Sequence, residues 1–392
     1  MPEPRTGVEL SHTREPSLSE LALAFLKLGT LAFGGPAAHI AMMEDEFVRK
    51  RQWITEADFL DRLAAANLIP GPSSTEVAIF IGRSKRGGAG LLVAGCCFII
   101  PATVMVAMIA VVYVRFGSLP QVAGILYAIK PAVIAIILQA LLSLARTATK
   151  TRLLAAVGVI SIALNTIGIA PLVVLAIAGI ASGAALWFKR QEGVALSAIS
   201  LSGRLALLSG AIAGGATAPV SLLRTFLSFL KIGSVVFGSG YVLLAFLRAE
   251  FINHLHWLTE KQLIDAVAVG QFTPGPVFTT ATFIGYLVAG IPGAVVATLG
   301  IFLPGFLLVA VSGPLIPKLR RSPMAGAVLD GVVVGSLALM GVVAWQLGRA
   351  AIADWLTALI FVASAVALLR FRLNSAWLIG GAALIGWMVK VH

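Results

Sequence analysis

The sequence predicts an all-α polytopic membrane protein built from two inverted-topology repeats whose helices are broken by glycine and proline. Composition, an internal duplication and the distribution of loop charges lead to this prediction. Of the 392 residues, 59% are hydrophobic and only 12% are charged, an apolar excess that no soluble core can bury. The composition excludes a soluble enzyme, a nucleic-acid-binding protein and a disulfide scaffold, and it makes the lipid bilayer the expected surroundings.

About 13 hydrophobic segments follow one another along the chain, and a spanning helix needs about 20 apolar residues. Nine segments are continuous. The other four are interrupted by glycine, in three of them together with proline, and they cover residues 21–43, 63–81, 226–247 and 266–288. Such interruptions are typical of the discontinuous helices that line transporter sites, so we expect broken or re-entrant segments there. Four complete spans are the alternative.

The chain contains an internal duplication. The pentapeptide FLKLG at 25–29 recurs as FLKIG at 229–233, 204 positions later, and PGP at 70–72 recurs as PGP at 274–276. Ordered matches over about 80 residues are a feature of transporters. The chain therefore divides into a polar N-terminal tail (1–17), a first repeat (18–203), a connecting transmembrane helix (204–223) and a second, inverted repeat (224–392).

Loop charges indicate that the two repeats have opposite orientations. The loop with Arg83, Lys85 and Arg86 is basic, whereas the equivalent loop near Pro292 carries no charge. In the second repeat the following loop is the basic one, with three cations between 318 and 321. Because basic loops stay in the cytoplasm, the N-terminus is expected in the cytoplasm and the C-terminus in the periplasm.

The heptapeptide PGPSSTE at 70–76 has the residue types of an oxyanion site. A helix starting after Pro72 would point free N–H groups and a partial positive charge at its N-terminus, and hydroxyl groups would add donors. The second repeat has Pro-Gly-Pro at 274–276, followed by Thr279 and Thr280, and its Gln271 is equivalent to Asn67. The expected substrate ligands are Asn67, Ser73, Ser74, Thr75, Gln271, Thr279 and Thr280. A plain proline kink with hydroxyls bonded back to the preceding turn is the alternative.

Two lysines at equivalent positions, Lys27 and Lys231, lie in apolar segments just before glycine-rich breaks. An axis in the membrane plane would let both approach one central dianion. The alternative is that each reaches out to the membrane interface. The breaks are the expected gates, and they contain Gly34, Gly35, Pro36, Pro70, Gly71, Pro72, Gly238, Gly240, Pro274, Gly275 and Pro276.

Three more ionisable residues lie in apolar segments, where a charge costs about 2.5–3.5 kcal/mol. Glu76 has no acidic counterpart in the second repeat. Because burial favours a neutral carboxyl group, Glu76 is the expected proton carrier, with a salt bridge to an intramembrane lysine as the alternative. Lys130 and Asp330 occupy nearly equivalent positions and are expected to form an ion pair. The sequence contains no recognisable metal-ligand set or cofactor motif.

These motifs resemble the chromate ion transporter family in its long form with two homologous halves. The resemblance runs from about residue 18 to the C-terminus, and its specific elements are FGGP at 33–36, Trp53, NLIPGP at 67–72, STE at 74–76 and Pro101. It implies efflux of chromate, a tetrahedral dianion, across the bacterial inner membrane, with chromate resistance as the result. It also implies a link to sulfate, which has the same shape and charge.

The residues and the resemblance together predict a secondary active transporter rather than an enzyme, coupled to protons or to exchange of another anion. A transporter of sulfate or another oxyanion, a passive anion channel and a membrane-bound chromate reductase are the alternatives. A reductase is disfavoured because no cofactor motif supports it. The sequence leaves the oligomeric state open, with a homodimer as one option.

The predicted orientation can be tested with reporter fusions. A C-terminal alkaline phosphatase fusion is expected to be active, because that enzyme works in the periplasm, and a C-terminal fluorescent-protein fusion is expected to be dark. The same two reporters at the N-terminus serve as the control and should give the reverse pattern. A bright, cytoplasmic C-terminal fusion would contradict the inverted arrangement.

Overall fold

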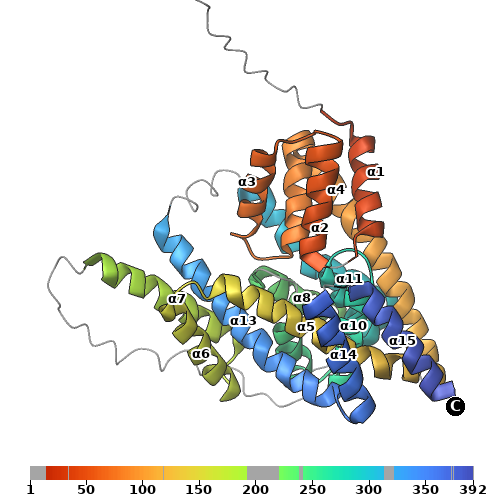
Figure 1. Cartoon of the computed structure of the whole chain (residues 1–392). Coiled ribbons are helices and arrows are strands. Elements are labelled where there is room, and N and C mark those ends of the chain that lie inside the picture. Colours follow the sequence, from red (N-terminus) through yellow and green to blue (C-terminus); the bar gives the residue numbers. More distant parts are fainter. Residues whose placement is uncertain are drawn as a thin grey trace, which may run out of the picture.

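The computed structural model describes residues 15–33, 35–117, 119–191, 220–237, 242–312, 322–371, 373 and 375–391, and this part of the chain is helical without strands (Figure 1). The all-α prediction is therefore confirmed there. The first half contains α1 (Leu18–Leu31), α2 (Gly35–Glu44), η1 (Asp45–Lys50), α3 (Glu56–Ala66), α4 (Ser73–Phe116), α5 (Pro120–Ala148), α6 (Arg152–Thr166) and α7 (Pro171–Gln191). The second half contains α8 (Leu222–Val235), α9 (Leu243–Leu247), η3 (Arg248–His254), α10 (Glu260–Phe272), η4 (Val277–Thr279), α11 (Thr280–Ser312), α13 (Pro323–Ala351), α14 (Trp355–Phe371) and α15 (Ser375–Val391).

Local structure repeats between the halves as the sequence does. Ser17 and Thr55 cap α1 and α3, and Ser221 and Thr259, each 204 positions later, cap α8 and α10; each hydroxyl accepts an N–H group of the first turn. The π-helices η1 and η3 occupy matching places. The same side-chain chemistry at the same spacing therefore forms the same helix starts twice.

Five helical stretches are long and apolar enough to cross a membrane, which makes the chain a multi-pass membrane protein. They are Ser73–Phe116, Val122–Ala148, Pro171–Phe188, Val277–Ser312 and Pro323–Ala351. Three shorter apolar helices, Arg152–Thr166, Trp355–Phe371 and Ser375–Val389, accompany them. The expected count of about 13 segments stays a prediction, as does the spanning helix at 204–223, which lies almost wholly outside the described residues.

The two longest helices each fold back on themselves. α4 has non-helical backbone at Arg86 and Gly87, and α11 has it at Ala289 and Gly290, with φ values of +56° and +62° at the two glycines. In each helix, a glycine before the turn and a glycine after it bring the backbones of the two arms into contact: Gly82 meets Gly90, and Gly285 meets Gly293. The first arm of α4, residues 73–85, is therefore about 20 Å long and is shorter than a complete span.

The halves exchange their last helices. α14 and α15 pack on α5 of the first half, and α6 and α7 pack on α13 of the second half. The contacts are close because glycines lie at the crossings: Gly386 of α15 touches the backbone of Gly124 in α5, and Gly331 of α13 touches the backbone of Ala178 in α7. The two repeats are therefore consecutive segments of the chain, but the last helices of each repeat pack on the other (Figure 1).

The equivalent helices α5 and α13 run antiparallel. Lys150, just after α5, contacts Asp330 near the start of α13 at 3.0 Å, and Tyr127 near the start of α5 donates a hydrogen bond to Asp354, just after α13. The start of each helix therefore lies beside the end of the other.

The exchange of helices predicts a specific glycine effect. Gly386→Ala should destabilise the protein by about 1–3 kcal/mol, because the added methyl group has no space against the α5 backbone. Gly381→Ala, on an open face of the same helix, is the matched control and should be neutral or slightly stabilising. Thermal unfolding in detergent, monitored by size-exclusion chromatography of heated samples, measures the stability of both variants. Equal effects of the two substitutions would contradict the α5–α15 packing.

Candidate functional site

The helix breaks of the two halves bind each other. The N–H group of Gly71 donates to the carbonyl of Val236 at 2.7 Å, and the N–H group of Gly275 donates to the carbonyl of Ala32 at 3.0 Å. These two hydrogen bonds are equivalent at the 204-residue offset. Each Pro-Gly-Pro segment therefore donates to a backbone carbonyl at the break that follows the first helix of the other half. Gly71 and Gly275 have φ values of +139° and +86°, which disfavour other residues.

The Pro-Gly-Pro segment in the first half leads directly into a helix. α4 begins at Ser73 with Pro72 as its N-cap, as expected from the sequence. Ser73, Ser74 and Thr75 form the first turn and are at most 6% exposed. The hydroxyl oxygen of Thr75 has no hydrogen-bond partner. The site therefore has the positive end of a helix dipole and buried hydroxyl groups at the interface between the halves.

Glu76 lies at the centre of this interface. Its side chain is fully buried, and neither carboxylate oxygen has a hydrogen-bond partner. The carboxyl group lies against Gly71, where a Cβ atom would collide with it, and near Gly305 of α11. The alternative of a salt bridge is not seen, since no lysine or arginine of the described residues pairs with Glu76.

His39 joins this site from α2. Its Nε2 atom is 3.0 Å from the carbonyl of Ala32, and its Nδ1 atom is 3.3 Å from the hydroxyl of Ser74. The imidazole is 1% exposed and meets Phe98 edge-on. Sequence reasoning assigned no role to His39, because the contact with Ser74 spans 35 positions and has no counterpart in the second half.

A cavity of about 430 Å³ opens beside the start of α4. Its lining joins the expected site residues Pro36, Asn67 and Ser73 to the Lys150–Asp330 ion pair, and it also contains Thr147 and Ser336. The hydroxyl of Ser336 is buried without a partner. The cavity therefore presents hydroxyl and amide groups, an ion pair with no net charge and a helix N-terminus, set among apolar side chains.

A second cavity, of about 270 Å³, corresponds to the first by the duplication. α5 and α13 start 203 positions apart, and at that offset Tyr127, Lys130 and Ala353 of the second cavity match Asp330, Val333 and Lys150 of the first. Because α5 and α13 are antiparallel, the two cavities lie at opposite ends of this helix pair.

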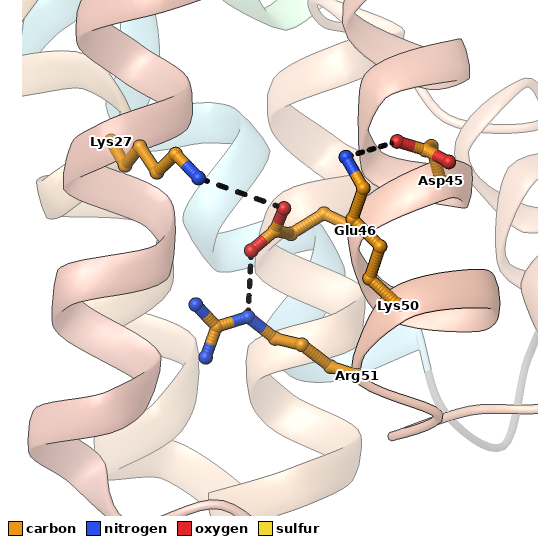
Figure 2. Close-up of polar contacts among 5 residues, drawn as sticks. All are labelled: Lys27, Asp45, Glu46, Lys50 and Arg51. Atoms are coloured by element: carbon orange, nitrogen blue, oxygen red, sulfur yellow. Dashed lines mark hydrogen bonds and ion pairs between the residues drawn. The ribbon is translucent and has the colours of Figure 1, made fainter.

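The two lysines expected at a central site are not at the helix breaks. Figure 2 shows Lys27 facing Glu46, at 4.0 Å, and Arg51 binding the same carboxylate at 2.7 Å. Lys231 binds the equivalent Glu250 at 2.7 Å. Their side chains are 57% and 49% exposed, so each lysine is a partly solvated cation already paired within its own half.

The expected ligands of the second half divide into two groups. The hydroxyls of Thr279 and Thr280 donate to the carbonyls of Pro276 and Val277 at 2.8 Å, which is the back-bonded arrangement given above as the alternative. Gln271 keeps a buried Nε2 atom without a partner. The expected gates Gly34, Gly238 and Gly240 lie outside the described residues.

The predicted Lys130–Asp330 ion pair is wrong. Lys130 binds Asp265 of α10 at 3.1 Å, and Tyr113 donates to the same carboxylate at 2.9 Å. Asp330 binds Lys150 instead. The physical reason is the antiparallel packing of α5 and α13, which places equivalent positions at opposite ends of the pair. Asp265 matches Asp61 at the 204-residue offset, a signal that indicated its position but not its partner.

Comparison with known proteins agrees with this architecture. The chromate transporter family model matches the chain twice, at residues 19–183 and 223–387. A chromate transport protein of Cupriavidus metallidurans is 36% identical over 94% of this chain and 92% of its own length. A probable chromate transport protein of Synechococcus elongatus is 33% identical over 88% of each chain, and a chromate transport protein of Pseudomonas aeruginosa is 29% identical over 95% and 92%. No solved structure matches. Two family matches that together cover most of the chain, one on each half, show that it belongs to the chromate transporter family.

Proposed function

We propose that the protein is a secondary active transporter that exports chromate across the bacterial inner membrane and thereby confers chromate resistance. The observation that carries this proposal is the interface where the helix breaks of the two halves meet. There, the polar start of α4 lies beside Glu76, a fully buried carboxyl group without a partner. Broken helices that meet between repeats are the usual location of substrate sites in secondary transporters.

The oxyanion is bound at the start of α4. Asn67 and Ser73 line the cavity, and Thr75 and Gln271 keep buried polar atoms without a partner, so these four donate to the anion. Ser74, whose hydroxyl contacts His39, is the fifth donor. Thr279 and Thr280 join the set only if their hydroxyls leave the carbonyls they now bind. Lys27 and Lys231 act by electrostatic attraction, since chromate must compete with Glu46 and Glu250 for them.

The two cavities are the two ends of the anion path. They are related by the duplication and lie at opposite ends of the antiparallel pair of α5 and α13. This arrangement supports inverted repeats that expose one central site alternately to the cytoplasm and the periplasm. Gly71 and Gly275, which hold the breaks together, are the natural positions for gating.

Glu76 couples anion movement to protons. An ionised carboxylate that is buried without a partner is costly, so the arrangement favours a protonated Glu76 in this conformation. A protonated carboxyl group also removes the charge that would repel a dianion at the adjacent helix start. Chromate and a proton would therefore occupy neighbouring positions in the same conformation and cross the membrane in the same direction. The pair carries one net negative charge, so the membrane potential, negative inside, drives its export.

Vesicle transport tests the proposed function. Inside-out membrane vesicles with this protein should accumulate radiolabelled chromate when the medium outside them is more acidic than their interior, and an excess of sulfate should suppress the uptake if the site accepts any tetrahedral dianion. Vesicles without the protein are the control. Uptake equal to that control would contradict chromate transport, and uptake indifferent to the gradient would favour anion exchange or a channel.

A substitution of Glu76 tests the coupling. Glu76→Gln keeps the shape of the protonated side chain but cannot release a proton. The variant is expected to lose the stimulation by the pH gradient while chromate exchange between the two sides of the vesicle continues. Glu56→Gln, an exposed position at the start of α3, is the matched control and should keep the gradient response. An unchanged gradient response of Glu76→Gln would rule out Glu76 as the carrier.

A further inference from the structure

The hydrogen bonds of His39 determine where its protons lie. The Nε2 atom faces the carbonyl of Ala32, which can only accept, so Nε2 carries a hydrogen. In a neutral imidazole the Nδ1 atom is then a bare acceptor, and the hydroxyl of Ser74 must be the donor to it. Neutral His39 therefore holds the single hydroxyl proton of Ser74, and that oxygen has only its lone pairs left for other contacts.

Protonation of His39 reverses this hydrogen bond. The imidazolium ion donates from both nitrogens, so Nδ1–H donates to the oxygen of Ser74. The hydroxyl proton of Ser74 is then free to donate to a different acceptor. One proton taken up by His39 thus adds one hydrogen-bond donor and one positive charge beside the start of α4, and both changes favour a bound dianion.

We propose that His39 is a positioning residue that sets the direction of the Ser74 hydroxyl, so that the oxyanion and a proton on His39 bind together. This inference rests on the proposed function, because it takes the start of α4 as the anion site. It adds a second group, besides Glu76, through which pH acts on substrate affinity.

The same imidazole is connected to the other half of the protein. The carbonyl of Ala32 accepts from His39 and also from the N–H group of Gly275, so His39 shares an acceptor with the Pro-Gly-Pro segment of the second repeat. At the equivalent positions, 204 residues later, the second repeat has Leu243 and Phe278, both buried and apolar. The imidazole–hydroxyl pair is therefore confined to the first repeat, as Glu76 is.

The charged groups around His39 are either paired or turned to other neighbours. α2 packs on α1, η1 and α4. Lys27 of α1 and Glu46 of η1 contact each other, and Glu76 of α4 faces Gly71 and Gly305. The remaining charged side chains of these elements and of α2 itself are Glu20, Glu44, Asp45, Arg49, Lys50, Arg83, Lys85, Arg86 and Arg115. The contacts of the two ring nitrogens are with Ala32 and Ser74, which are uncharged.

Equilibrium dialysis of the purified full chain with radiolabelled chromate tests the inference. With His39 present, Ser74→Ala should raise the Kd for chromate about tenfold at about pH 4, because a buried imidazole without an acidic partner takes up a proton only in acid of that strength, and by less than about twofold at about pH 8. In the His39→Leu background the hydroxyl is never held, so Ser74→Ala should raise the Kd by the same factor at both pH values. Ratios between variants at one pH cancel the protonation of chromate itself.

Matched variants separate this effect from folding and from Glu76. His39→Gln, which also cannot take up a proton, replaces His39→Leu if the leucine variant is not monodisperse in detergent. His254→Gln removes a half-exposed histidine elsewhere, and the pH dependence of the Ser74→Ala effect should survive it. Repeating the measurement in the Glu76→Gln background removes the carboxyl group proposed as the proton carrier, and the pH dependence should again survive.

Two results would overturn the inference in distinguishable ways. An equal effect of Ser74→Ala at both pH values, with His39 present and chromate bound by the unmodified protein, would refute the role of His39 alone. Failure of the unmodified protein to bind chromate at either pH would refute the proposed function, and the inference with it.

Discussion

The structure depends on the two hydrogen bonds that join the helix breaks across the halves, Gly71 to Val236 and Gly275 to Ala32. A broken helix leaves N–H and carbonyl groups unsatisfied, and in a membrane protein water is not available to bind them all. Here the break in each half is satisfied by the Pro-Gly-Pro segment of the other. The start of α4 is consequently fixed at the interface, and the site is complete only when both halves are assembled.

The exchanged helices stabilise this interface. α14 and α15 cover α5, and α6 and α7 cover α13, so separating the halves would expose the packed faces of both long helices. Glycines at the crossings allow close backbone contact, which replaces the hydrophobic effect as the source of association between helices in lipid. Any movement that opens one cavity and closes the other must therefore occur within an interlocked pair, as a rearrangement at the breaks rather than a separation of the halves.

The two halves form the same backbone arrangement at the helix breaks, but the ionisable side chains near the breaks come from the first repeat. At three positions near the breaks the first repeat has His39, Ser74 and Glu76, whereas the second has Leu243, Phe278 and Thr280. The hydroxyl of Thr280 is bound to its own backbone. In the proposed function, this polar cluster on a symmetric frame would bind one anion and its protons in one place, while the other half provides the backbone groups that hold the breaks.

The sequence by itself determined the membrane class, the duplication, the start of α4 after Pro72 and the lack of an acidic counterpart to Glu76 in the second repeat, because composition, repeats and helix-start residues are local or periodic signals. Only the tertiary structure decided the partners. It paired Lys130 with Asp265 and Asp330 with Lys150, bound Lys27 and Lys231 to glutamates of their own halves, and brought His39 to Ser74. The physical reason is that these contacts follow from the antiparallel packing of α5 and α13 and from the meeting of the breaks. Both arise from close contact between segments far apart in the chain, which spacing along the sequence does not encode.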